Sequence, residues 1–210
     1  MGIESDLLFN KKFLAQLRDL IELHHSLYPR TPPQGIFFES LVEQAFKRSG
    51  WPADQISLST ANTPQHDLLV GDVRISLKTE TGAGTHPDLI NITKLCTTET
   101  GPWESANLVQ HALEHLARYD HLLMLRALWR PVAIHYQLIE IPIDVLKRMA
   151  GVTVQAVGKR AGRPSMAADV FDQEGKLFRV HFDGADGKCQ IHRLRLSRCR
   201  MLIAWDEFMK

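Results

Sequence analysis

The chain has 210 residues and a formal net charge of +1, with 44% hydrophobic and 23% charged side chains. This length is enough for one domain with a real core, and the composition is that of an ordinary globular protein. The near-zero charge excludes a strongly basic field over the whole protein, so contact with nucleic acid would need a local basic surface.

Targeting signals and cysteine frameworks are not evident. The first residues lack the basic start and apolar run of a secretory signal, and no stretch has the apolar length that spans a bilayer. The three cysteines, Cys96, Cys189 and Cys199, show neither metal-ligand spacing nor a disulfide framework. We therefore expect no membrane association and a location in the reducing cytoplasm.

Two amphipathic helices are predicted before the first strands. Apolar residues recur at helical spacing over residues 5–27, and three prolines then interrupt the chain. A second helix is expected over residues 35–48, where Gly50 follows as a stop signal. Glu39 falls in the first turn of this helix, and a short strand is expected at residues 56–58.

Residues 65–80, with the sequence QHDLLVGDVRISLKTE, predict a hairpin. The apolar run 68–70 is followed by a Gly-Asp turn signal, and residues 73–80 then alternate strictly between apolar and polar. A half-buried strand of this kind would bring Ser76, Lys78 and Glu80 to its open face, and Asp67 lies on the preceding strand.

Such a face suits phosphodiester hydrolysis. A hard cation such as Mg²⁺ prefers oxygen ligands, and a carboxylate at the end of a strand can hold it. A nearby lysine can orient the attacking water and offset charge on the phosphate. The alternative interpretation is an amphipathic surface hairpin whose polar face is only solvated.

The hairpin and the helix before it resemble the PD-(D/E)xK nuclease superfamily, which includes most type II restriction endonucleases. In that family a metal-binding Asp precedes a strand that carries (D/E)-x-K, and an upstream helix often adds a Glu. The matching residues here are Asp67, the tripeptide Ser76-Leu77-Lys78, and Glu39. The resemblance implies that Asp67 and the Leu77 carbonyl bind Mg²⁺, with Mn²⁺ as a substitute, and that Lys78 positions the water.

The sequence departs from the family pattern at Ser76, where Asp or Glu is usual. Serine brings no charge and is a poor ligand for a hard divalent ion, so another carboxylate must complete the acidic set. Glu39 is the first candidate for this role, Glu80 the second and Glu104 the third. Ser76 itself is expected to act as a placeholder or as a hydrogen-bond partner of the metal ligands.

Further strands are expected at residues 89–95, 121–129 and 132–141, with helices at 103–119 and 143–149. His111 and His115 lie at i, i+4 in the first of these helices, a spacing that can bind zinc. The intervening glutamate is one place away from the metalloprotease pattern, and no third ligand is indicated. A solvated helix face is the competing interpretation.

From residue 151 the composition changes to short strands, at residues 152–157, 170–171, 177–182 and 190–196, around a basic glycine-rich loop. Arginine and lysine neutralise phosphates, and arginine can pair bidentately with guanine. We expect DNA contacts from this region, made by Lys159, Arg160, Arg163, Arg193 and Arg195. Alternation over 190–196 would give Gln190, His192 and Leu194 one face and Ile191, Arg193 and Arg195 the other.

The sequence as a whole predicts one α/β nuclease domain. Its mixed central sheet would be flanked by helices, with a catalytic core at 1–150 and a β-rich, DNA-contacting portion at 151–210. The resemblance implies a Mg²⁺-dependent type II restriction enzyme that cuts double-stranded DNA and forms a homodimer on a palindromic site. The alternatives are a repair or junction-resolving nuclease of the same superfamily, and a DNA-binding module without activity.

Overall fold

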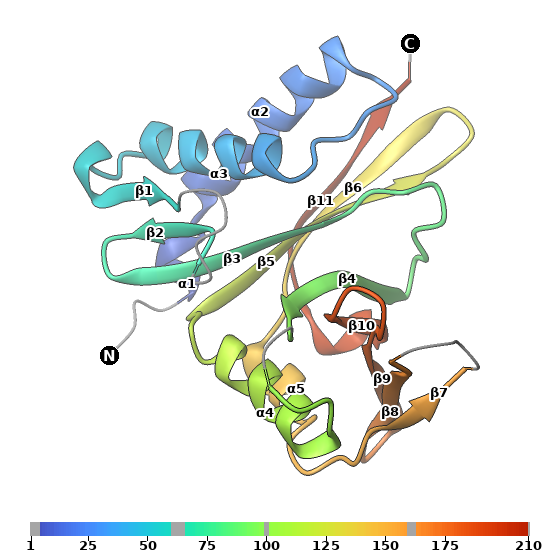
Figure 1. The fold of residues 1–210 in the computed structure, drawn as a ribbon. Coiled ribbons are helices and arrows are strands. Elements are labelled where there is room, and N and C mark those ends of the chain that lie inside the picture. The colour runs from blue at the N-terminus through green and yellow to red at the C-terminus, as the bar shows by residue number, and fades with distance from the viewer. Residues whose placement is uncertain (1–4, 60–65, 99–100, 159–162, 210) are drawn as a thin grey trace. The chain divides into compact units, whose positions relative to one another are not determined.

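The computed structural model describes residues 5–59, 66–98, 101–158 and 163–209 (Figure 1). Contacts divide the chain into two compact units. The first comprises Met1–Thr85, Arg118–Pro142 and Cys199–Lys210, and the second His86–Ala117 and Ile143–Arg198. This division differs from the boundary near residue 150 that composition indicated, because the chain crosses between the units more than once.

A six-stranded mixed sheet forms the centre of the first unit, in the order β1-β2-β3-β5-β6-β11. Only β3 and β5 are parallel in this sheet, and all its other neighbours are antiparallel. The strands are β1 (Ile56–Leu58), β2 (Leu68–Val70), β3 (Val73–Glu80), β5 (His121–Trp129), β6 (Ala133–Glu140) and β11 (Arg200–Phe208). Most of these match the predicted strands, and β11 has no counterpart among them.

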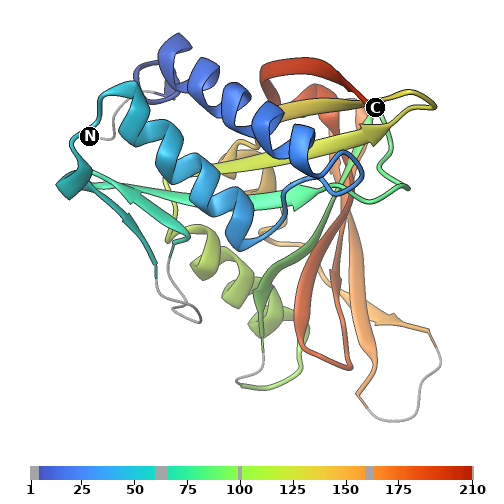
Figure 2. The same cartoon turned by 90° about the horizontal axis from the view of Figure 1, so that it is seen from above.

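The N-terminal helices cover one face of this sheet (Figures 1 and 2). They are α1 (Ser5–Leu8), α2 (Lys11–Leu27) and α3 (Ile36–Ser49), with a short 3-10 turn, η1 (Ala53–Gln55), before β1. The single helix expected over 5–27 is interrupted because Asn10 adopts an extended conformation and caps α2. Its Oδ1 accepts hydrogen bonds from the backbone N–H groups of Lys12 and Phe13, both at 3.0 Å.

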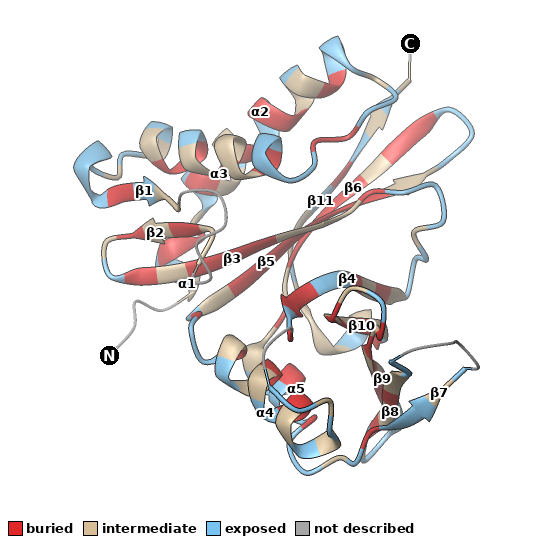
Figure 3. Ribbon diagram, viewed as in Figure 1, coloured by how far each residue is buried: buried red, intermediate tan, exposed pale blue. Residues whose placement is uncertain are grey.

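The core of the first unit lies between these helices and the sheet (Figure 3). Phe13 of α2 stacks on Phe46 of α3 with ring centroids 4.2 Å apart, and both side chains are fully buried. Helix α3 ends at Gly50, whose φ of 104° is a conformation that glycine adopts without steric cost. Packing and cap together fix the position of the helix that carries Glu39.

The second unit is built on a five-stranded antiparallel sheet in the order β4-β10-β9-β8-β7. Its elements are β4 (Leu89–Thr97), α4 (Ser105–Leu116), α5 (Ile143–Lys147), β7 (Gln155–Val157), β8 (Ser165–Asp172), β9 (Gly175–Phe182), β10 (Lys188–Arg195) and η2 (Leu196–Arg198). The chain is therefore a mixed α/β protein with flanking helices and a β-rich C-terminal half. No helix in the described ranges is both long and apolar enough to cross a membrane.

The predicted alternation of strand 190–196 is wrong beyond His192. Leu194 is fully buried, as are Cys189 and Ile191, whereas Arg193 is exposed. A register shift between Ile191 and Leu194 resets the alternation. One extra residue in a strand moves every later side chain to the other face, and the hydrophobic pattern alone did not reveal it.

We predict that replacing Phe46 by alanine lowers the free energy of unfolding by about 3–5 kcal/mol, because it removes a fully buried ring from the stack with Phe13. Chemical denaturation monitored by circular dichroism measures the change. Exposed Phe37, on the same helix, is the matched control, and its alanine variant should lose less than about 1 kcal/mol. Equal losses in the two variants would contradict this packing.

Candidate active site

The carboxylate of Asp67 is the centre of a hydrogen-bonded cluster on the β2–β3 hairpin. Its Oδ2 accepts hydrogen bonds from the backbone N–H of Leu77 at 2.6 Å, from Ser76 Oγ at 3.0 Å and from Lys78 Nζ at 3.2 Å. The backbone of Asp67 is held as well, since its N–H donates to the Ile75 carbonyl and its carbonyl accepts from Ser59. The hairpin thus extends its ladder to Asp67 and fixes this carboxylate.

The ammonium group of Lys78 is surrounded by oxygen atoms from the same hairpin. Its Nζ donates to Ser76 Oγ at 2.9 Å and to the Leu77 carbonyl at 3.1 Å, besides its ion pair with Asp67. The side chains of Lys78 and Asp67 keep 19% and 31% exposure, so the pair is open to a ligand from solvent. The cluster therefore binds a positive charge through oxygen atoms only.

Glu39 faces this cluster from the first turn of α3. Burial raises the pKa of its carboxyl, the negative charge of Asp67 raises it further, and the positive charge of Lys78 partly offsets both effects. Glu39 is therefore close enough for the charges of Asp67 and Lys78 to change the pKa of its carboxyl. The structure brings together Glu39, Asp67, Ser76 and Lys78, the residues that the sequence pattern selected.

Ser76 links the two charged groups of the hairpin. Its side chain is fully buried, and its hydroxyl donates to Asp67 and accepts from Lys78. The open face expected around this residue is thus closed at Ser76 itself. A neutral hydroxyl at this position holds Asp67 and Lys78 in place without adding a third negative charge.

Glu80 lies on the same strand but has a different partner. Its Oε2 accepts a hydrogen bond from Arg126 Nε at 2.9 Å, and Arg126 Nη1 donates to Gln137 Oε1 at 2.7 Å. Arg126 is fully buried, so Glu80 neutralises a charge that has little access to water. Glu104, the third candidate, is the N-cap residue of α4 in the other unit.

The donor set around Asp67 fits a hard divalent cation. It offers the carboxylates of Asp67 and Glu39 and the Leu77 carbonyl, all oxygen ligands of the type that Mg²⁺ prefers. No group of three or more His, Cys, Asp or Glu side chains within the described residues has metal-binding geometry. An ion at Asp67 would accordingly need ligands beyond these side chains, such as the Leu77 carbonyl and water.

The predicted DNA-contacting residues fall into three groups. Lys159 and Arg160 lie outside the described residues. Arg163 donates from Nε to the Gly184 carbonyl and lies 4.0 Å from the centre of the Trp103 ring, and Arg195 pairs with Asp172 and Glu174. Arg193 is exposed. The basic residues of this region therefore differ in the hydrogen bonds, ion pairs and ring contacts that they make with neighbouring residues.

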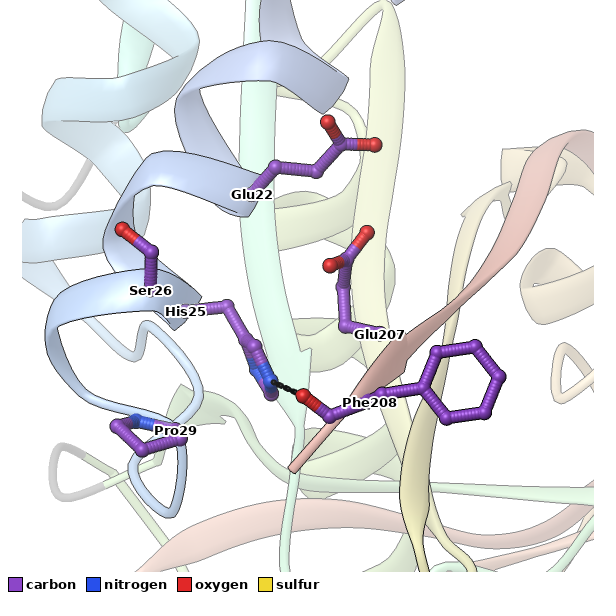
Figure 4. Close-up of a pocket in the computed structure, with 6 residues that line it drawn as sticks. All are labelled: Glu22, His25, Ser26, Pro29, Glu207 and Phe208. Carbon is purple, nitrogen blue, oxygen red and sulfur yellow. Dashed lines mark hydrogen bonds between the residues drawn. The ribbon is translucent and has the colours of Figure 1, made fainter. Parts of the chain in front are cut away.

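A separate pocket lies at the C-terminal end of α2 beside β11 (Figure 4). His25 contacts Tyr136 through Nδ1 and the Phe208 carbonyl through Nε2, at 3.2 and 3.3 Å. Burial raises the pKa of the Glu207 carboxyl, with a further contribution from nearby Glu22. Residues Glu22, His25, Ser26, Pro29, Glu207 and Phe208 line this pocket. None of the residues predicted for catalysis is among them.

Comparison with known proteins identifies the family of this chain. Residues 3–207 match the SmaI family, which is described as type II site-specific deoxyribonuclease. The chain belongs to the SmaI family. It is 29% identical over 205 residues to the type II restriction enzyme SmaI of Serratia marcescens, covering 95% of this chain and 81% of that enzyme.

A solved restriction endonuclease in complex with substrate DNA is also similar, with a TM-score of 0.37 and 20% sequence identity. That match covers 69% of this SmaI-family chain and 64% of the solved chain. The resemblance to restriction-endonuclease-like nucleases, stated from the hairpin and Glu39, is confirmed by the family match. The enzyme class is therefore that of a type II site-specific deoxyribonuclease.

The pairing of Glu80 with Arg126 is a feature that sequence reasoning missed in this SmaI-family chain. Arg126 stands alone as a charge within the apolar strand sequence HLLMLRALW. A single charge in such a strand requires a buried partner, and β5 pairs with β3 so that Arg126 lies opposite Glu80. The single arginine in this apolar strand was therefore the sequence feature from which a buried acidic partner could have been predicted.

We predict that Glu80→Gln destabilises the fold by about 3–5 kcal/mol, because it leaves the buried Arg126 charge uncompensated. Divalent-metal affinity, measured by calorimetry on the folded variant, should stay within about threefold of wild type, since Glu80 is engaged elsewhere. Glu43→Gln, which removes only a surface pair with Lys47, is the control and should cost less than about 1 kcal/mol. Loss of metal binding with unchanged stability would instead make Glu80 a ligand.

Glu39→Gln should raise the stability of the fold at neutral pH. The raised pKa means that the folded state disfavours the charged form, so this charge costs stability at neutral pH and the cost disappears as the pH falls through the pKa. The variant should therefore melt about 1–3 °C higher than wild type at pH 7, with the difference vanishing near pH 4. A melting curve series across this pH range tests the sign, and a variant less stable at pH 7 would contradict it.

Proposed function

We propose that this chain hydrolyses double-stranded DNA at a specific sequence in a Mg²⁺-dependent reaction, with Mn²⁺ as a substitute, and that Glu39, Asp67, Ser76, Leu77 and Lys78 form its active site. One observation carries the proposal. A single carboxylate oxygen of Asp67 accepts hydrogen bonds from Leu77, Ser76 and Lys78, and the charges of Asp67 and Lys78 act on the carboxyl of Glu39. The family match supports site-specific cleavage of DNA.

Each residue has a distinct part in the proposed reaction. Asp67, Glu39 and the carbonyl of Leu77 would hold the ion, which when bound stabilises negative charge on the phosphate and lowers the pKa of bound water. The Ser76 hydroxyl keeps Asp67 oriented. Lys78 orients the attacking water and offers its positive charge to the phosphate as charge develops in the transition state.

The hairpin is suited to this chemistry because its polar atoms are ordered before DNA arrives. The Leu77 N–H and the Ser76 hydroxyl already donate to Asp67, so little reorganisation is needed at the moment of reaction. The raised pKa of Glu39 also has a function here. A carboxylate kept next to another negative charge favours the binding of a cation that relieves the repulsion.

We further propose that two copies act together on a palindromic site, because two-fold symmetry in the protein then matches that of the DNA. Lys159, Arg160, Arg163, Arg193 and Arg195 are proposed to contact the DNA; of the three that the structure describes, Arg163 and Arg193 are exposed and Arg195 is half-buried. Cys96, Cys189 and Cys199 are free thiols, which fits an enzyme that works in the cytoplasm.

We predict that Asp67→Asn and Lys78→Ala each lower the cleavage rate at least about 100-fold, since each removes a charge from the cluster. The measurement is digestion of phage genomic DNA with Mg²⁺, where wild type should yield discrete fragments. Binding to a duplex that carries the mapped site should persist in Lys78→Ala.

Lys11→Ala, which removes an exposed cation at the start of α2, is the control and should cut at the wild-type rate. Wild-type protein that leaves the DNA intact, or cuts it into a smear, would contradict the proposed site-specific reaction. An Asp67→Asn variant that cuts normally would leave that reaction in place and overturn its assigned active site.

A further inference from the structure

Strand β10 contains one extra residue opposite β4. Ile191 pairs with Ile92 and Leu194 pairs with Ile90, so three steps along β10 correspond to two along β4. This is the register of a β-bulge. Both flanking side chains are fully buried, which holds the bulge between two fixed points of the core.

Arg193 occupies the bulge in an unusual backbone conformation. Its φ is +57°, and it is the non-glycine residue with positive φ within the described ranges. Side chains with a Cβ are disfavoured in this left-handed region, whereas glycine adopts it freely. A residue with this backbone conformation is usually glycine, so the presence of arginine points to a use for its side chain.

The side chain of Asn91 on β4 secures this conformation. Its Oδ1 accepts a hydrogen bond from the backbone N–H of Arg193 at 3.1 Å. The bulge otherwise removes this N–H from the regular ladder, so the Asn91 amide replaces a lost backbone acceptor. Asn91 thereby supports the backbone from which the Arg193 side chain extends into solvent.

The guanidinium of Arg193 differs from those of its neighbours. Arg195 and Arg198 share an ion-pair network with Asp172 and Glu174. Arg179 pairs with Asp169, and Arg163 is held by the Gly184 carbonyl and Trp103. No hydrogen bond or ion pair of the Arg193 guanidinium is found among the residues that the structure describes. Its five N–H donors are therefore available to a partner outside the protein.

We propose that Arg193 is a specificity-determining residue that reads the major-groove edge of a guanine, and that Asn91 is its positioning residue. The inference rests on the proposed function, cleavage of double-stranded DNA at a specific sequence. Neutralising a phosphate needs only a flexible cation, whereas bidentate pairing with guanine O6 and N7 needs a guanidinium at a fixed position and angle. The bulge supplies such a position, because it lies between the buried side chains of Ile191 and Leu194 and its backbone N–H is hydrogen-bonded to Asn91.

Arg193→Gly gives the sharpest test, because glycine suits φ +57° and the fold should be kept or stabilised. Affinity would be measured with Ca²⁺ in place of Mg²⁺, on a duplex carrying the mapped cleavage site and on a duplex lacking it. The variant should bind the site roughly 10- to 100-fold more weakly, bind the other duplex within about threefold of wild type, and melt no lower than wild type.

Duplexes in which single guanines carry 7-deazaguanine locate the contact. Wild type should lose affinity when one particular guanine lacks N7, and Arg193→Gly, which has no side chain to donate to N7, should show no loss at that position. Asn91→Ala should weaken site binding in the wild-type background and have no effect in Arg193→Gly, since its role acts through Arg193. Lys94→Ala, which removes an exposed cation on neighbouring β4, is the control and should not alter discrimination.

Two results would overturn the inference while leaving the proposed function intact. Arg193→Gly that binds and cuts the site like wild type would show that its side chain is dispensable. Arg193→Gly that loses affinity equally for both duplexes would make it a phosphate contact. Failure of the proposed function would look different, because wild-type protein would then show no sequence preference in binding or cleavage.

Discussion

The structure of the candidate site depends on the hydrogen bond from the Leu77 N–H to Asp67 Oδ2, at 2.6 Å. This bond ties a carboxylate at the start of β2 to the middle of β3, and the same oxygen accepts from Ser76 and Lys78. Because these donors come from consecutive residues of one strand, the geometry of the strand sets their positions. The chemistry proposed for this SmaI-family chain thus rests on an element of the sheet, and not on a loop that would need ordering.

Glu39 and Glu80, two carboxylates near β3, differ in the charged groups that surround them. Burial raises the pKa of the Glu39 carboxyl, and the nearby charge of Asp67 raises it further, a repulsion that a bound cation would relieve. Glu80 faces the buried Arg126, which already neutralises it. Both residues belong to the acidic set expected from the sequence, and their neighbours distinguish them. Glu39 is the proposed metal ligand, whereas Glu80 pairs with Arg126 between β3 and β5.

Much of the first unit follows from local sequence patterns. Alternation predicted the β2–β3 hairpin and helical spacing predicted α3, and the family resemblance of these two elements then selected Asp67, Lys78 and Glu39 as candidates. Features that depend on distant partners were not predicted. β11 forms by pairing with β6, and the Glu80–Arg126 pair depends on the register of β3 against β5, with the two residues 46 positions apart in the chain. The cap at Asn10 is local, but it was missed because the apolar pattern continues across it. The bulge at Arg193 was hidden for a related reason, since a single inserted residue becomes visible only when the partner strand is known.

Anomalous X-ray scattering from crystals soaked in Mn²⁺ tests the central claim most directly, because it locates the ion independently of activity. The account predicts a peak bonded to a carboxylate oxygen of Asp67 and to the Leu77 carbonyl, with Glu39 completing the acidic ligands, and no peak in crystals of Asp67→Asn. A peak at Glu80 or at another group of side chains, with none at Asp67, would contradict it.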